Sequence, residues 1–276
     1  MKILADSSAL YSVEEGKALG VQIIPVCVVI NDETYRDYED ITPEQFLQMI
    51  AEGGMPTSSQ PAIGDVIDAF EETEEEILYL TVGDGLSGTY QNAMAVKNSI
   101  EDNEHIHVVD SKSLAGVNHY LVQKAVALRD KGLQVVDVIR ELQESIESSV
   151  SFVIPSDFEF LKRSGRLTPV AAKIGSLIKI VPVLTQTEDK QRITPFAIKR
   201  SSKKAVDAIV NHLKNIGVSE NHVISICHAG VVEHAKEVCE YVKKEFPGAL
   251  VEMFHLSAAL ITHGGPGSIV IQAVRK

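Results

Sequence analysis

Three separated segments of the chain, each expected to form a loop or turn, carry small hydroxyl side chains, glycines and one histidine, which are residue types suited to holding an anion. The first is Thr57-Ser58-Ser59-Gln60, the second spans residues 83–91, and the third is His263-Gly264-Gly265-Pro266-Gly267. Hydroxyl and imidazole groups donate hydrogen bonds without adding a buried charge, and glycine lets a ligand approach the backbone. This set suits binding a carboxylate or a phosphate rather than cleaving a bond.

The second segment has the pattern of a strand that turns sharply into a helix. An apolar run at 78–82 precedes a glycine turn at 83–85, and a helical pattern follows with Ala93 and Val96 on one face. The start of such a helix has unpaired backbone N–H groups that favour an anion. Ser87 adds a hydroxyl there and Gly88 leaves the backbone accessible, although an ordinary N-cap serine has the same pattern.

Two other functions are compatible with these residues. Ser87, Asp110 and His263 occur in the chain order of an α/β-hydrolase triad, but the sequence around Ser87 has a glycine out of place for G-x-S-x-G. A phosphate- or nucleotide-binding module is the second alternative, and it predicts affinity for ATP without any lipid. Neither alternative is excluded by the motifs alone.

Two basic clusters interrupt an acidic chain. Lys162, Arg163 and Arg166 form the first, and Lys199, Arg200, Lys203 and Lys204 form the second. In a protein of net charge −12, such local positive patches indicate docking to an acidic partner or to nucleotide phosphates. Lysines solvated at helix ends are the alternative interpretation.

The composition limits the class of protein. A length of 276 residues suggests one large domain or two ordinary ones, and the net charge of −12 argues against nucleic acid or an anionic membrane as the main partner. Asp6 comes too early for a signal peptide, and the longest apolar run, 21–30, is too short to span a bilayer. Three cysteines without a C-x-x-C spacing indicate reduced thiols, so we expect a cytoplasmic protein with no metal site.

The elements that position these segments divide into two halves. In residues 1–148, strands at 2–5, 21–30, 77–82 and 106–109 alternate with helical patterns, which predicts a mainly parallel α/β domain. Ligands bind at the carboxyl ends of such strands, where Asp6-Ser7-Ser8 and residues 83–87 fall. Residues 149–276 predict a second, mixed α/β domain with a hairpin at 181–198 and a closing strand at 268–274. We place the boundary near Ser148.

The motifs together resemble the DegV family. They are Asp6-Ser7-Ser8, Thr57-Ser58-Ser59-Gln60-Pro61, Leu86-Ser87-Gly88-Thr89-Tyr90-Gln91, Val109-Asp110-Ser111, Leu161-Lys162-Arg163-Ser164-Gly165-Arg166-Leu167 and His263-Gly264-Gly265-Pro266-Gly267. They occur in the family's order and span nearly the whole chain. The resemblance implies two α/β domains with a long-chain fatty acid bound between them.

The resemblance also implies a role as the fatty-acid-binding subunit of bacterial fatty acid kinase. In that system a separate dihydroxyacetone-kinase-like protein phosphorylates the bound acyl carboxylate, using ATP and Mg²⁺. This chain is then a carrier without catalytic residues or a cofactor of its own, and it contacts membrane surfaces only transiently. We assign docking of the kinase to Arg166, Arg200 and Lys203.

Carried over by position, the carboxylate site consists of Ser58, Ser87, the backbone of Gly88, and His263. The family's threonine is Ser58 here, Thr57 takes its place if the alignment shifts by one residue, and Gly264 is a further candidate. Val181 precedes Pro182 where the family often has a lysine. We expect the acyl tail to lie in the C-terminal domain, against the apolar side of residues 170–178 with Phe158 and Phe160, unless these side chains are ordinary core.

Overall fold

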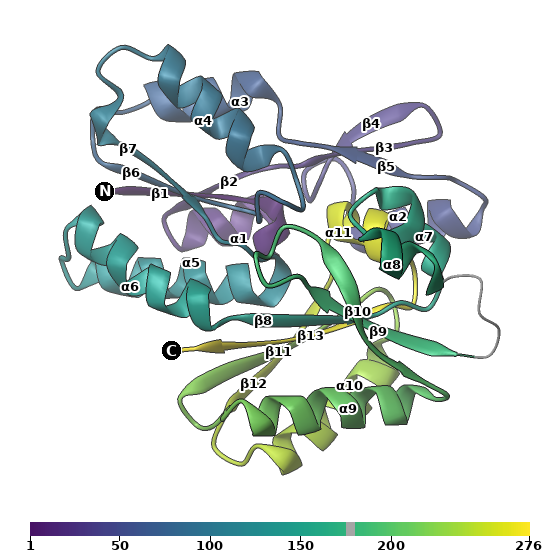
Figure 1. Ribbon diagram of the computed structural model, residues 1–276. Coiled ribbons are helices and arrows are strands. Elements are labelled where there is room, and N and C mark those ends of the chain that lie inside the picture. Colours follow the sequence, from purple (N-terminus) through teal and green to yellow (C-terminus); the bar gives the residue numbers. More distant parts are fainter. Residues whose placement is uncertain (175–179) are drawn as a thin grey trace.

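The computed structural model describes residues 1–174 and 180–276, which form an α/β protein with three sheets (Figure 1). One sheet is parallel, one is mixed and one is a small antiparallel sheet. This arrangement confirms the predicted fold class. The predicted boundary near Ser148 falls between the helix that ends at Ser148 and the strand that begins at Val150, and it stays a prediction.

The parallel sheet has the order β2-β1-β6-β7, and its central strand β6 is buried at every residue. Alternate residues of its strands face opposite sides, so Leu4 and Tyr79 pack with α3 and α4, whereas Ile3 and Leu78 pack with α5 and α6. The elements are β1 (Lys2–Asp6), η1 (Ser7–Ala9), α1 (Val13–Ala18), β2 (Val21–Ile24), α3 (Ile63–Glu71), β6 (Ile77–Thr81), α4 (Thr89–Ser99), η2 (Asn103–His105), β7 (Ile106–Asp110), α5 (Ala115–Asp130) and α6 (Val135–Ser148).

The mixed sheet has the order β10-β9-β8-β13-β11-β12, in which only β11 and β12 pair in parallel among the described strands. Helices α9 and α10 cover its outer face, and α5 and α6 lie between it and the parallel sheet (Figure 1). The elements are β8 (Val150–Ile154), β9 (Val181–Gln186), β10 (Ile193–Lys199), α9 (Ser202–Asn215), β11 (His222–His228), α10 (Val232–Glu245), β12 (Leu250–His255) and β13 (Ile269–Arg275).

The antiparallel sheet corrects two predictions. It consists of β3 (Cys27–Ile30), β4 (Glu33–Arg36) and β5 (Thr57–Ser59), and α2 (Pro43–Ala51) follows β4. The predicted single strand at 21–30 is therefore two strands in different sheets. Pro25 lacks the N–H that a continuous ladder needs, and the Val26 N–H bonds instead to Ser7 Oγ at 3.0 Å. The segment at 57–60, predicted as a loop, supplies the edge strand β5.

The third correction concerns His263, which we predicted in a glycine turn. It lies in the last turn of α11 (Ala258–Gly264), because the apolar residues before it continue a helix until Gly265, at a φ of +78°. Helix α11 packs against α2, β3, β5 and α7 (Phe158–Ser164), and α8 spans Pro169–Ala172. N-terminal and C-terminal segments thus meet around α11. In the described part of the chain, no helix combines the length and the apolar character that crossing a membrane requires.

Candidate functional site

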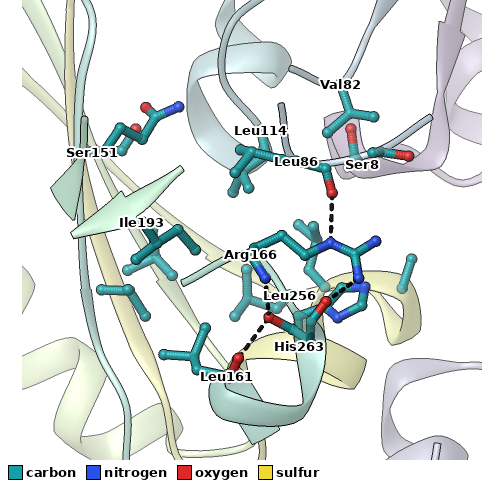
Figure 2. A pocket seen from close by; sticks show the side chains of 18 of the residues that line it. Ser8, Val82, Leu86, Leu114, Ser151, Leu161, Arg166, Ile193, Leu256 and His263 are labelled. Carbon is teal, nitrogen blue, oxygen red and sulfur yellow. Dashed lines mark hydrogen bonds between the residues drawn. The ribbon is translucent and has the colours of Figure 1, made fainter. Parts of the chain in front are cut away.

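A cavity lies between the two halves of the chain, and its walls are mostly apolar (Figure 2). The volume of the cavity is about 120 Å³. The apolar side chains of its wall are Val26, Val82, Leu86, Leu114, Phe152, Val153, Leu161, Leu184, Ile193, Leu256, Ala259, Leu260 and Val270. The site therefore suits a long apolar molecule.

Ser58 and His263 meet at this cavity, with 2.7 Å between Ser58 Oγ and His263 Nε2. The register of β5 explains the choice of residue: Thr57 and Ser59 face the other side of the strand and are exposed. Of the two residues that the alignment left open, it is Ser58 that faces His263. Gly264 lies on the same wall, and Thr57 is not part of it.

A buried aspartate holds the helix that carries His263. Asp37 is fully buried, and its Oδ1 accepts a hydrogen bond from the Ala258 N–H at 3.0 Å, at the start of α11. Its Oδ2 accepts from Ser7 Oγ–H at 2.9 Å. Burial raises the pKa of Asp37 to about 6, against several hydrogen bonds that lower it. Ser7 of the run Asp6-Ser7-Ser8 thus helps to fix α11 through Asp37.

The electrostatics of the site keep His263 neutral. Burial, and secondarily the charge of Arg166, lower the pKa of His263 to about 3. Arg166 forms no ion pair with a carboxylate in the described residues, and burial lowers its pKa as well. Its Nε donates to the Leu86 carbonyl at 2.9 Å and its Nη1 donates to the Ser164 carbonyl. Figure 2 shows this guanidinium between Leu86 and His263.

The structure separates Arg166 from Arg200 and Lys203, with which it was predicted to dock the kinase, and that docking stays a prediction. Arg166 lines the cavity, and its carbonyl accepts a hydrogen bond from the Ile193 N–H, where β10 begins. Arg200 follows the other end of β10, about 20 Å away along the strand, and is exposed, as is Lys203. The sequence interpretation did not include Arg166 in the carboxylate site. Its place in the same motif as Ser164, which also lines the cavity, is the sequence feature that could have indicated this role.

Ser87 also lines the cavity, in the turn between β6 and α4. Its Oγ is 2.9 Å from Thr89 Oγ1 and accepts a hydrogen bond from the Thr89 N–H at 3.3 Å. Gly88, not Ser87, is the N-cap of α4. A Cβ on Gly88 would lie 2.6 Å from Gln60 Oε1, so this glycine makes room for the segment that carries Ser58.

The hydrolase triad is not assembled. The hydrogen bonds of Ser87 go to Thr89, and His263 bonds to Ser58. Asp110 accepts bonds from the backbone N–H groups of Asp84 and Lys112, at 3.0 and 2.8 Å, and does not line the cavity. Among residues 1–174 and 180–276, no group of three or more His, Cys, Asp or Glu side chains is placed to hold a metal ion.

The residues expected to line the acyl tail are not in the cavity wall where the structure describes them. Val170 is 66% exposed, and Phe158 packs behind the wall, in a cluster that includes the wall residue Leu161. Phe160 contacts the position of Gly265 rather than the cavity. Leu177 and Ile178 lie outside the described residues. The apolar wall comes instead from both halves of the chain, so no single amphipathic helix marks it in the sequence.

The chain is similar to proteins of one known family over its whole length. A family model described as "uncharacterised protein, DegV family" matches residues 1–276. The chain belongs to the DegV family. A DegV domain-containing protein of Staphylococcus aureus, SA1258, is 28% identical over 278 residues, covering 99% of this chain and 98% of that protein.

Two solved DegV structures have the same fold over the whole chain. DegV of Bacillus subtilis, described as a fatty acid binding protein, has a TM-score of 0.87 at 27% identity and covers 100% of this chain and 99% of that one. A DegV family protein of Thermus thermophilus, described by its fatty acid binding, has a TM-score of 0.88 at 26% identity, with the same coverage. These likenesses confirm the predicted family and fold.

Proposed function

We propose that this DegV-family protein binds a long-chain fatty acid in the cavity and presents its carboxylate to a separate kinase, which phosphorylates it to an acyl phosphate. The observation that carries the proposal is an apolar cavity with a half-buried guanidinium, Arg166, beside the Ser58–His263 pair. The fatty acid binding of the Bacillus subtilis and Thermus thermophilus relatives supports it.

The polar end of the cavity suits a carboxylate. Burying an ionised carboxylate is costly unless a positive charge and hydrogen-bond donors surround it. Arg166 supplies the charge, because no carboxylate of the described chain pairs with it, and its guanidinium is already fixed by bonds to Leu86 and Ser164. The hydroxyls of Ser58 and Ser87 and the imidazole of His263 supply further polar contacts on the same cavity. We therefore add Arg166 to the predicted carboxylate site.

The apolar wall supplies the binding energy. Each methylene of a saturated tail contributes up to about 0.8 kcal/mol when it leaves water. For a long-chain fatty acid, the sum over its methylenes exceeds the free-energy cost of association. The polar end adds to this affinity and sets the orientation of the ligand. A held and oriented carboxylate is the substrate that phosphoryl transfer by a second protein requires.

The chain itself acts as a carrier in this proposal. The dihydroxyacetone-kinase-like partner brings ATP and Mg²⁺, and we assign its docking to Arg200 and Lys203 on the exposed end of β10 and the first turn of α9. We expect the protein to work in the cytoplasm, with transient contacts to membrane surfaces from which fatty acid is taken.

The proposal is tested by extracting the purified protein with organic solvent and identifying acyl chains by mass spectrometry. We expect about one long-chain fatty acid per chain, and binding of added palmitate or oleate after delipidation. Absence of acyl chains, together with no binding of either fatty acid, would refute it. Hydrolysis of short acyl esters that is lost in Ser87→Ala would instead favour the hydrolase, and affinity for ATP without lipid would favour the nucleotide module.

A further inference from the structure

The cavity wall contains a second group of polar residues, away from the carboxylate end. Ser151 on β8 and Gln186 on β9 both line the cavity, and neither belongs to the proposed carboxylate site. Figure 2 shows Ser151 and His263 on opposite sides of the cavity, with Arg166 between them. A ligand whose carboxylate lies at His263 therefore meets this second group with its acyl chain.

The register of the mixed sheet places these polar residues in one row. Val153 of β8 pairs with Leu184 of β9, so the same antiparallel register puts Ser151 opposite Gln186, two positions away on each strand. Ser151 also pairs with Gln272 of β13. Side chains directly opposite one another point to the same face of a sheet. Ser151, Gln186 and Gln272 thus form a polar row across three neighbouring strands.

The next row on this face is apolar and lies nearer to α11. It consists of Val153, Leu184 and Val270, which all line the cavity. Val270 is the second residue of β13, the strand that follows α11, whereas Gln272 is two positions further along it. Successive rows on one face are about 6.7 Å apart. An acyl chain that leaves the carboxylate end therefore crosses an apolar row before it reaches the polar one.

Gln272 orients the Ser151 hydroxyl. It is fully buried, and its Nε2 donates to Ser151 Oγ at 2.8 Å and to the Leu114 carbonyl at 3.0 Å, while its Oε1 accepts from the Val117 N–H at 3.3 Å. Because Ser151 Oγ accepts the bond from Gln272, its own hydrogen is left to be donated, either to Ser113 Oγ at 3.3 Å or to a ligand.

Gln186 has an acceptor left over. Its Nε2 donates to the carbonyls of Lys112 and Lys190 at 2.9 and 3.3 Å, which uses both amide hydrogens and fixes the orientation of the amide. Within residues 1–174 and 180–276, Gln186 Oε1 accepts no hydrogen bond. A saturated chain that displaces water from this oxygen leaves it without a donor, which is unfavourable, whereas a hydroxyl on the chain supplies one.

We propose that the polar row is a subsite for a hydroxyl group on the acyl chain, so that the cavity takes an oxygenated long-chain fatty acid. The ligand hydroxyl donates to Gln186 Oε1 and accepts from the Ser151 hydroxyl. A hydroxyl both donates and accepts, so it matches one free acceptor and one free donor on adjacent strands, where opposite Cβ atoms are about 5 Å apart. A keto group only accepts, so it would leave Gln186 without a partner. The inference rests on the proposed function, because the carboxylate must lie at the other end of the cavity.

The test compares stearate with its monohydroxy derivatives, substituted in turn along the chain, by isothermal titration calorimetry on the delipidated full chain. The ratio of hydroxystearate to stearate affinity is measured in each protein, because a general effect of a substitution cancels in this ratio. The ratio should reach or exceed one at one position or a few adjacent ones, since elsewhere the hydroxyl lies against apolar side chains.

Two variants assign the favoured position to the polar row. Gln186→Leu should lower the ratio there about 5-fold or more, as loss of one neutral hydrogen bond does, and Ser151→Ala should lower it at the same position. The matched control is Gln48→Leu, an exposed glutamine on α2 that bonds to Glu52, which should leave every ratio unchanged. The ketostearate of the favoured position should bind less tightly than the hydroxystearate in the parent protein.

The possible results separate the subsite from the proposed function. Ratios below one at every position, or a maximum that Gln186→Leu leaves unchanged, overturn the subsite and leave fatty acid binding standing. If Gln186→Leu does not fold, Ser151→Ala decides in the same way. A ketostearate that binds as tightly as the hydroxystearate also overturns the role of Gln186. Failure of stearate and every hydroxystearate to bind the parent protein overturns the proposed function and the subsite with it.

Discussion

Ser58 Oγ and His263 Nε2 lie 2.7 Å apart although 205 positions separate the two residues in the chain. The contact joins the edge strand β5 to the last turn of α11, so it links the antiparallel sheet to the C-terminal half at the wall of the cavity. Because His263 is neutral, either tautomer satisfies this bond. When the ring nitrogen donates, the Ser58 hydroxyl is free to donate its own hydrogen to a carboxylate.

The first prediction concerns this hydroxyl. Ser58→Ala should weaken palmitate binding by about 1.5–3 kcal/mol, which is about 10- to 150-fold, because a hydrogen bond to a charged group is lost. Isothermal titration calorimetry measures the change. Ser59→Ala is the matched control, since Ser59 is one position along the same strand and faces away from the cavity. Equal affinities of Ser58→Ala and the parent would contradict the carboxylate role of Ser58.

The second prediction concerns the ionisation of His263. Its imidazole should titrate near pH 3 in the fatty-acid-free protein, far below the ordinary value of 6.5. Arg166→Gln should raise this midpoint, because the charge of Arg166 is the second cause of the lowered pKa. Imidazole C–H chemical shifts followed by NMR from pH 8 to below pH 3 give the midpoint. A midpoint near 6.5 in the parent protein would show that the ring is solvated and the site open.

The third prediction follows from the buried histidines as a group. Burial lowers the pKa of His119 and of His228 to about 4, and that of His263 to about 3. The stabilisation from keeping these rings neutral is fully present above their unfolded pKa of 6.5, and it is lost as the pH falls toward 3–4. Asp37 acts in the opposite sense, because its raised pKa favours the folded state below 3.8 and loses that effect as pH rises through about 6.

Urea unfolding at pH 7 and pH 5 tests this balance. The free energy of unfolding should be lower at pH 5, and His119→Gln should reduce the difference because one buried ring no longer has to stay neutral. An unchanged pH dependence in His119→Gln would contradict the claim for that ring.

The sequence was sufficient to predict most of the architecture, because hydrophobic periodicity and turn-forming residues indicate helices, strands and their ends locally. The capping box at Thr42 and Gln45, the helix over 202–215 and the hairpin at 181–198 all follow from residues close in the chain. The division of residues 21–30 into two strands at Pro25 was missed, because an apolar, β-branched run looks the same whether or not its two ends join one sheet. Contacts distant in the sequence, such as the bond from the Val26 N–H to Ser7, determine where the first strand ends.

The candidate site was predictable in part, through motifs rather than physics. Ser58, Ser87 and His263 line one cavity, but their convergence depends on a strand register and a helix cap at Asp37 that no local pattern reveals. Arg166 was not predicted in the carboxylate site because a cationic cluster in the sequence indicates an exposed surface, whereas this guanidinium lines the cavity and bonds to two carbonyls. The full apolar wall was not predicted because it is assembled from many elements.

The fourth prediction tests the contact between the two halves at Gly85. A methyl group there would meet the backbone of Gln191 at 2.2–2.5 Å, which cannot be relieved by a side-chain rotation. Gly85→Ala should therefore lower the free energy of unfolding by about 1–3 kcal/mol, as overpacking does. Urea denaturation measures it. Gly64→Ala is the control: it has open space in α3, and we expect it to be neutral or up to about 1 kcal/mol more stable.

The last prediction concerns docking of the kinase. Lys203 and Lys204 lie in the first turn of α9, where the helix dipole disfavours cations and no acidic residue compensates. Together with exposed Arg200 they form a positive patch. Grouping these cations destabilises the isolated protein slightly, and an acidic partner would relieve the repulsion. A standard protein interface of about 800 Å² per partner is wide enough to reach from this patch to the cavity at Arg166. Arg200→Glu should lower the rate of kinase-dependent acyl phosphate formation about 10-fold or more and leave palmitate affinity unchanged.

Two variants make this prediction specific. Arg140→Glu changes the net charge by the same amount on exposed α6, where Arg140 pairs with Asp137 at 2.8 Å, and it should leave the rate unchanged. Arg166→Gln should instead weaken palmitate binding itself, because its guanidinium lies in the cavity wall. If Arg200→Glu lowers palmitate affinity as much as the rate, the patch acts through the ligand and docking is refuted. If Arg140→Glu slows the reaction equally, the net charge of the protein rather than a docking surface governs the encounter with the kinase. The two substitutions change the charge equally on different faces, so only a local contact at Arg200 would make their effects differ.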